Sequence, residues 1–152
     1  MIKVLFVCHG NICRSPMAEF ILKKMVEERG LSDEFEIASA ATSDEEIWNG
    51  RGNPVYPPAK AELRKHGISC DEKRARRLTK ADYDYYDYLI GMDSYNIRNM
   101  ERMTGHTGGK ISMLLSFAGS SASISDPWYS GDFETTYKDI ERGCKAFLEK
   151  IL

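Results

Sequence analysis

The segment near the start of the chain combines residues that could bind an anion and attack it. An apolar run, Ile2 to Val7, leads into Cys8 to Ser15, which reads Cys-His-Gly-Asn-Ile-Cys-Arg-Ser, and Pro16 then opens a helical pattern. A loop between a strand and a helix turns consecutive backbone N–H groups inward, and the helix start adds free N–H groups and a positive dipole end. The hollow therefore suits a phosphate. The same field should stabilise a thiolate at Cys8 and make it nucleophilic.

Three further residues of this segment fit the same chemistry. The planar guanidinium of Arg14 can hold two phosphate oxygens with paired hydrogen bonds, which the point charge of a lysine does not reproduce. Gly10 stands where backbone must approach a ligand, and the Ser15 hydroxyl can donate to the Cys8 sulfur. A buried strand can also end in a cysteine that only fills the core. The combination favours a phosphate-binding loop with a nucleophile.

A second candidate segment lies near the C-terminus and reads Asp126-Pro127-Trp128-Tyr129. Breaking a phosphate ester at a thiolate requires a proton for the departing oxygen, and Asp126 is the best candidate for that general acid. Pro127 stiffens the backbone, while the two aromatic residues can wall a pocket for a ring. Taken alone, the segment is an ordinary Asp-Pro turn. Beside the Cys8 loop, it predicts the missing proton donor.

Strands and helices alternate along the rest of the chain. Apolar periodicity and cap residues predict strands at 2–7, 35–41, 88–92 and 110–115, and helices at 16–29, 57–66, 93–103 and 137–151, with a short helix starting at Thr79. No repeat or linker interrupts this order. It predicts one α/β domain over residues 1–152, with a parallel sheet covered on both faces. Ligands of such sheets bind at the carboxyl ends of strands, where the Cys8 loop lies.

Composition excludes several classes of protein. The chain is 42% hydrophobic and 29% charged, with a net charge of −2, so it is expected to be globular and gives no electrostatic reason to bind nucleic acid. It has no apolar stretch of membrane-spanning length and no secretory signal, which predicts a cytoplasmic protein. Its four cysteines are expected to be free thiols, sensitive to oxidation. The basic cluster formed by Lys73, Arg74, Arg76 and Arg77 is expected to be a solvated face.

The chain resembles the low-molecular-weight protein tyrosine phosphatases. The resemblance covers nearly the whole length and is carried by Val7 to Pro16 and Asp126 to Tyr129, in the family's order and separation. It implies a three-layer sandwich around a four-stranded parallel sheet, a phosphocysteine intermediate on Cys8, phosphate clamping by Arg14, and Asp126 as general acid and then base. No metal or other cofactor is implied. The expected partners are phosphotyrosine proteins, with phosphate or vanadate as active-site anions, and the expected state is a monomer.

The resemblance also assigns supporting roles. It implies that phosphate is bound by the loop residues His9, Gly10, Asn11, Ile12, Cys13 and Ser15. It places Asn11, Ser15, Ser39 and His66 at positions whose hydrogen bonds hold the loop in its binding shape. It suggests that Cys13 forms a disulfide with Cys8 during oxidation and so shields it from further oxidation. A structural thiol at Cys13 is the alternative.

Two features depart from the commonest pattern of this family. His9 stands where many relatives carry a small or apolar residue, and three roles stay open for it: lining the pocket mouth, stacking on a substrate ring, or perturbing Cys8. The loop at 42–53 is longer than usual. Its Trp48 is a candidate for the pocket rim, with covering of the core as the alternative. Both features leave substrate preference open.

Three rival functions share parts of this pattern. Arsenate reductases of the same fold use a close downstream cysteine pair, whereas no cysteine lies between residues 71 and 143 here. Phosphoarginine phosphatases of the same family carry a smaller polar residue at the position of Ile12 and lack the paired aromatics after the Asp, so Ile12, Trp128 and Tyr129 favour a tyrosine ring. A binding protein without catalysis would have lost the nucleophile, the arginine or the acid, and all three are present.

Overall fold

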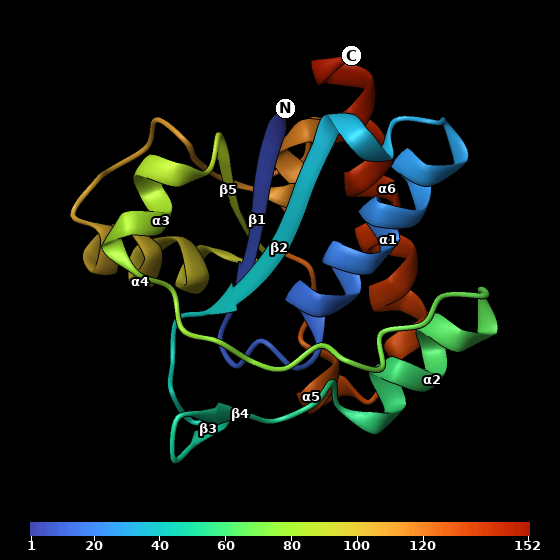
Figure 1. The fold of residues 1–152 in the computed structure, drawn as a ribbon, viewed down its shortest axis with the longest axis horizontal. Coiled ribbons are helices and arrows are strands. Elements are labelled where there is room, and N and C mark those ends of the chain that lie inside the picture. Colours follow the sequence, from blue (N-terminus) through green and yellow to red (C-terminus); the bar gives the residue numbers. More distant parts are fainter.

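A four-stranded parallel sheet forms the centre of the protein in the computed structural model, which describes residues 1–152 (Figure 1). Its strands are β1 (Ile2–Cys8), β2 (Phe35–Ala41), β5 (Tyr88–Gly91) and β6 (Ile111–Met113), in the order β2-β1-β5-β6. Every neighbouring pair is parallel. The predicted fold class is therefore confirmed, and the four predicted strands lie within two residues of their expected bounds.

Helices cover both faces of this sheet (Figure 1). One layer holds α1 (Arg14–Glu28), α2 (Pro57–Lys65) and α6 (Phe133–Ile151), and the other holds α3 (Lys80–Tyr85) and α4 (Ser94–Thr104). Side chains of β1 alternate between the two cores, as a strand's period of two requires. Phe6 and Cys8 belong to the core under α1 and α6, whereas Leu5 and Val7 belong to the core under α4. This alternation places the Cys8 side chain beside the start of α1.

Short elements complete the chain, most of them where the sequence predicted loops and one, Leu114–Ala118, overlapping the end of the strand predicted at 110–115. The segment 42–53 contains a small antiparallel hairpin of β3 (Ile47–Trp48) and β4 (Arg51–Gly52). Two 3-10 turns, Ser32–Glu34 and Leu114–Ala118, precede β2 and follow β6 respectively. The last addition is α5 (Pro127–Ser130), a one-turn helix. None of these runs has enough residues to produce a periodic sequence signal.

The predicted helix caps are present in two places. Thr79 and Asp82 form a reciprocal capping box at α3, and the Asp93 side chain accepts from the N–H of Asn96 at α4. The first helix begins at Arg14, two residues before the predicted start at Pro16. Arg14 and Ser15 therefore belong to the first turn of α1, where backbone N–H groups lack partners within the helix. No helix of the protein is long and apolar enough to cross a membrane.

Candidate active site

The segment between β1 and α1 forms a loop in which several backbone carbonyls accept hydrogen bonds, whereas the backbone N–H groups have no partner in the protein. The carbonyls of His9, Ile12 and Cys13 accept from Ser43, Tyr56 and Met17, whereas no backbone N–H of residues 9–13 donates to a protein acceptor. Asn11 takes a positive φ of 59°, a left-handed conformation that Asn tolerates better than most residues. The loop is thus a cradle of unpaired donors at the positive end of α1, which is the arrangement an anion requires.

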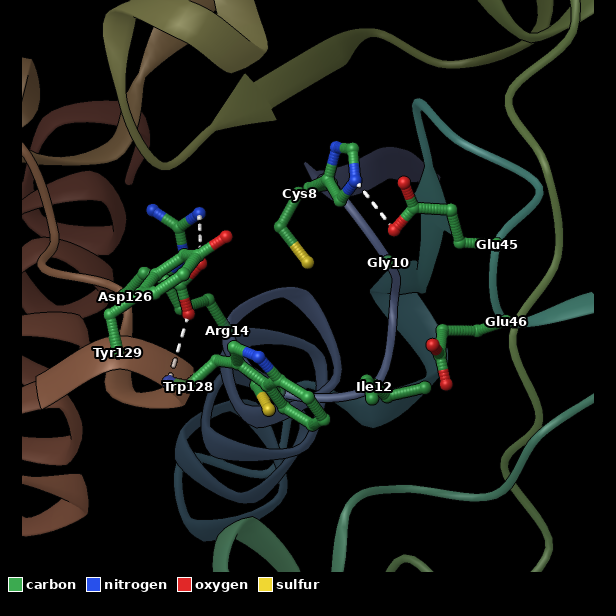
Figure 2. Close-up of a pocket in the computed structure, with 11 residues that line it drawn as sticks. Cys8, Gly10, Ile12, Arg14, Glu45, Glu46, Asp126, Trp128 and Tyr129 are labelled. Carbon is green, nitrogen blue, oxygen red and sulfur yellow. Dashed lines mark hydrogen bonds and ion pairs between the residues drawn. The ribbon is translucent and has the colours of Figure 1, made fainter. Parts of the chain in front are cut away.

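The Cys8 sulfur lies beside the N-terminus of α1 and has two hydrogen-bond partners, both from Ser15. The Ser15 hydroxyl is 3.0 Å from it, and the Ser15 backbone N–H donates to it at 3.4 Å. The side chain of Cys8 is buried, and a cavity of about 200 Å³ opens above it (Figure 2). Donors from a helix start stabilise a thiolate better than a thiol. The geometry therefore suits a sulfur nucleophile.

Arg14 lines the same cavity, and its guanidinium is held in place by groups from distant parts of the chain. Nη1 donates to Asp93 at 2.7 Å and to the carbonyl of Ile124 at 2.9 Å, while Nη2 lies 3.5 Å from a carboxylate oxygen of Asp126. Burial works against the positive charge, but the Cys8 sulfur and the two carboxylates outweigh it and raise the pKa of Arg14. The Arg14 guanidinium therefore has a fixed orientation and a permanent positive charge beside the expected position of a phosphate.

Asp126 and the two aromatic residues after it form one side of the cavity (Figure 2). Asp126 caps α5 by accepting from the N–H of Trp128 at 3.0 Å, which fixes one carboxylate oxygen and leaves the other toward Arg14. The Trp128 ring packs on Tyr56 with centroids 4.7 Å apart, whereas Tyr129 is 86% exposed. The Trp128 ring is therefore held by a contact with another ring, whereas the Tyr129 side chain is largely exposed to solvent.

Glu45 and Glu46 form the opposite side (Figure 2), and His9 lines the same cavity. His9 Nε2 lies 3.0 Å from a Glu45 oxygen, so the phosphate-binding loop is tied to the segment 42–53. Gly10 leaves room for this segment, because a Cβ there would lie 3.2 Å from Glu46 Cγ. His9 lines the cavity, which is compatible with the first of the roles left open for it. Its Glu45 partner was not foreseen.

A hydrogen-bond network under the loop holds Asn11 in its left-handed conformation. Its Nδ2 donates to Ser15 Oγ at 2.8 Å and to Ser39 Oγ at 2.9 Å, and its Oδ1 accepts from the Arg76 N–H at 3.1 Å. Ser39 donates in turn to the buried Glu19. The residues implied for loop support are thus brought together in Asn11, Ser15 and Ser39.

Two residues predicted for the site lie outside it. His66 Nε2 is 3.3 Å from Glu62, and its ring stacks on Tyr137 at 3.7 Å, so the loop-support role predicted for it is not supported by any hydrogen bond to the loop. Trp48 is 77% exposed on β3 and does not line the cavity. In both cases the residue type suggested a role in the site, but the helix or strand that carries the residue places its side chain away from the cavity.

Sequence reasoning missed three residues that matter here. Asp93 lies two residues after the end of β5, the strand next to β1, and an acidic residue at that edge was an available signal for an arginine partner. Glu19 lies one helical turn after Ser15 on the buried face of α1, where a charge is out of place. Lys73 was expected on a solvated face, yet only 12% of its side chain is exposed and its ammonium donates to the Ser39 carbonyl.

The four cysteines are free thiols, all buried. Cys13 lines the cavity with Cys8, but burial, assisted by the nearby Cys8 and Asp126, raises its pKa far above the usual range. Burial likewise raises the pKa of Cys144 in the core of α6. Of the two cavity thiols, Cys13 is thus the one that its surroundings hold in the thiol form.

The comparisons with known proteins agree with this geometry. The family model described as low molecular weight phosphotyrosine protein phosphatase matches residues 3–152. The chain belongs to this family. A low molecular weight phosphotyrosine protein phosphatase of Sus scrofa is 42% identical over 97% of this chain and 94% of the relative. The resemblance predicted from Cys8 to Ser15 and from Asp126 to Tyr129 is confirmed, and the chain is classed as a protein tyrosine phosphatase, as predicted.

Solved structures of related proteins have the same fold. The crystal structure of YfkJ from Bacillus subtilis matches with a TM-score of 0.93 and 39% identity, covering 99% of this chain and 94% of that one. A Drosophila arginine phosphatase matches with a TM-score of 0.87 and 33% identity, over 99% and 98% of the two chains. Because phosphatases named for tyrosine and for arginine share this fold, the choice between a phosphotyrosine and a phosphoarginine substrate must depend on the pocket walls.

Proposed function

We propose that this phosphatase hydrolyses phosphotyrosine in proteins by two in-line displacements. In the first, the Cys8 sulfur attacks phosphorus, the bond from phosphorus to the tyrosine oxygen breaks, and Asp126 gives its proton to that oxygen. In the second, water attacks the phosphocysteine, Asp126 takes the proton, and phosphate leaves with the Cys8 thiolate restored. The single observation that carries this is the convergence of Cys8, Arg14 and Asp126 on one cavity lined by free amides.

The loop and Arg14 stabilise the transferring group throughout both steps. Free N–H groups of residues 9–13 and the guanidinium face the three equatorial oxygens, where negative charge is held during transfer. The Ser15 hydroxyl, 3.0 Å from Cys8, stabilises the sulfur both as nucleophile and as leaving group. Phosphate and vanadate are expected to bind the same cradle.

The pocket walls favour an aromatic ester. Ile12, Trp128 and Tyr129 line the cavity, and none of them offers a charge to a guanidinium substrate. The carboxylates of Glu45 and Glu46 line the side of the cavity that faces away from Asp126 (Figure 2). A flat ring between Trp128 and Ile12 would keep phosphorus in line with Cys8. Phosphotyrosine is thus preferred over phosphoarginine.

The proposal also covers the context in which the enzyme works. All parts of the site come from one chain, which supports residues 1–152 acting as a single catalytic domain and as a monomer. Free buried thiols and a nucleophilic Cys8 require a reducing compartment such as the cytoplasm. Oxidation of Cys8 would stop turnover, and Cys13, lining the same cavity, is the candidate partner for a protective disulfide.

Hydrolysis of para-nitrophenyl phosphate by wild type, Cys8→Ser and Asp126→Ala tests the mechanism. Cys8→Ser should lose turnover and still bind vanadate. Asp126→Ala should lose much more activity on phenyl phosphate than on the nitrophenyl ester, whose better leaving group needs less protonation. Wild-type turnover by Cys8→Ser would refute the mechanism. Matched phosphotyrosine and phosphoarginine peptides then test the substrate preference, and a higher kcat/KM for phosphoarginine would refute the preference for tyrosine.

A further inference from the structure

A buried threonine on α6 is hydrogen-bonded to the segment that carries Asp126. Thr136 has no exposed surface, and its Oγ1 donates to the carbonyl of Ser125 at 3.2 Å. The two residues lie 11 positions apart in the sequence. A threonine in a helix commonly gives its hydroxyl proton to the carbonyl three or four residues before it. Here the proton goes instead to the residue that immediately precedes the proposed general acid.

Packing alone does not account for a hydroxyl at this position. Thr136 lies on the buried face of α6 together with Tyr137 and Ile140, which belong to the main apolar core. A buried hydroxyl costs free energy unless it is hydrogen-bonded, whereas a valine side chain of nearly the same shape has no such cost. The contribution that distinguishes threonine from valine here is therefore the hydrogen bond to Ser125.

This hydrogen bond holds the peptide group that joins Ser125 to Asp126. The group is planar, so the direction of the Ser125 carbonyl also sets the direction of the Asp126 N–H and of the bond to the Asp126 Cα. The Asp126 N–H donates to no protein group. Thr136 Oγ1 is therefore the one hydrogen-bond partner that this peptide group has in the protein.

Other contacts hold the residues on either side of this peptide group. Ile124 makes two hydrogen bonds, one of them with the Arg14 guanidinium, and the Asp126 side chain caps the one-turn helix α5. Residues 120–126 form no helix or strand of their own. The direction of the chain between Ile124 and α5 thus depends on the peptide group that Thr136 holds. Thr136 belongs to a helix of 19 residues packed against α1, which gives the hydrogen bond a rigid support.

We propose that Thr136 is a positioning residue for the general acid: its hydroxyl fixes the peptide group before Asp126 and so keeps the Asp126 carboxylate directed into the cavity. The proposal rests on the role proposed above for Asp126. Thr136 does not line the cavity, so it acts on the reaction only through that carboxylate. Without the hydroxyl the peptide group can rotate, and the carboxylate then reaches the departing oxygen in a smaller fraction of molecules.

The test compares Thr136→Val with the wild type on aryl phosphates of different leaving group, from phenyl phosphate to para-nitrophenyl phosphate. The substitution keeps the side-chain shape and removes the hydroxyl. It should lower kcat/KM for phenyl phosphate about fivefold, as expected for the loss of one hydrogen bond. The loss should be much smaller for the nitrophenyl ester, whose leaving group needs less protonation. The rate of Cys8 alkylation by iodoacetate should match the wild type, because the phosphate-binding loop is unchanged.

Two variants serve as controls. Thr136→Ser keeps a hydroxyl and should restore the wild-type dependence on the leaving group. Thr104→Val is the matched control, because Thr104 is also a buried helical threonine, donates to the Met100 carbonyl within α4, and lies outside the cavity. It should keep the wild-type dependence on the leaving group even where it lowers Tm.

Two outcomes with Thr136→Val would overturn the proposal. One is wild-type kcat/KM with every ester, and the other is an equal loss with every ester, which indicates a general packing defect. Should the valine variant not fold, Thr136→Ala removes the same hydroxyl and is judged by the same two outcomes.

A double-mutant cycle separates an effect through Asp126 from an independent one. Adding Thr136→Val to Asp126→Ala should lower kcat/KM no further, because Thr136 acts only through that carboxylate. Additive losses would contradict the proposal. Failure of the proposed function itself would look different: turnover in Cys8→Ser, or a wild-type dependence on the leaving group in Asp126→Ala.

Discussion

Replacing Asp93 by serine should loosen Arg14 while leaving α4 intact. The Asp93 carboxylate does two things: one oxygen accepts from the Asn96 N–H at the start of α4, and the other holds Arg14 Nη1 at 2.7 Å. Serine is a good N-cap, but its hydroxyl is too short and uncharged to replace the ion pair. Asp93→Ser thus separates helix capping from orientation of the guanidinium.

The size of the effect follows from the burial of the pair. A hydrogen bond to a charged group contributes about 1.5–3 kcal/mol. The side chain of Arg14 is 4% exposed and that of Asp93 is 22% exposed, so solvent screens the pair only in part, and we take about 2 kcal/mol. That corresponds to a loss of about 30-fold in kcat/KM and a comparable rise in the vanadate inhibition constant. The Ile124 carbonyl keeps part of the orientation, which prevents a larger loss.

Hydrolysis of para-nitrophenyl phosphate and its inhibition by vanadate measure both constants, and urea unfolding measures stability. Asp132→Ser is the matched control, because Asp132 caps α6 through the Thr135 N–H and lies outside the cavity. The control should keep wild-type kinetics. Unchanged kcat/KM and vanadate inhibition in Asp93→Ser would refute the view that Asp93 orients Arg14.

Three further predictions test other parts of the molecule. Iodoacetamide at pH 8 should label Cys8 and leave Cys13 unlabelled in mass spectra, since the raised pKa of Cys13 keeps it a thiol; equal labelling of both would contradict this. After mild peroxide treatment, Cys13→Ala should recover less activity on reduction than wild type, and equal recovery would remove the protective role of Cys13. Gly52→Ala should lower Tm by about 6 °C (about 2 kcal/mol), because its Cβ would lie 1.8 Å from the Ala75 carbonyl oxygen; an unchanged Tm in thermal denaturation would show that the hairpin at 42–53 is not pinned there.

The elements that sequence predicted well are those with a long periodic signal. The apolar strand before Cys8 lies where it was expected, and the last helix, with apolar residues at three and four spacing, was found but begins at Phe133, four residues before its predicted start. The hairpin at 42–53 and the turn of helix after Asp126 were missed, because two to four residues are too few for periodicity. Helix caps at Thr79 and Asp93 were found because cap residues act within four residues.

The amino-acid sequence by itself determined the chemistry of the site. Cys8 and Arg14 lie within one short loop between a strand and a helix, and Asp126 carries its own turn and aromatic neighbours, so local geometry already implies what each can do. Local rules also place the loop at the carboxyl end of a strand, because that is where a β-α connection must lie.

Only the tertiary structure decided which residues support that chemistry. Asp93 reaches Arg14 across 79 positions, Lys73 reaches the Ser39 carbonyl across 34, and His9 meets Glu45 across 36. Sequence-based expectation placed His66 in the network and Lys73 in solvent, whereas in the structure His66 contacts Glu62 and Lys73 contacts Glu19 and the Ser39 carbonyl. The physical reason is that these contacts depend on sheet order and helix packing, which arise from the burial of apolar residues over the whole chain and leave no local pattern at the polar residues themselves.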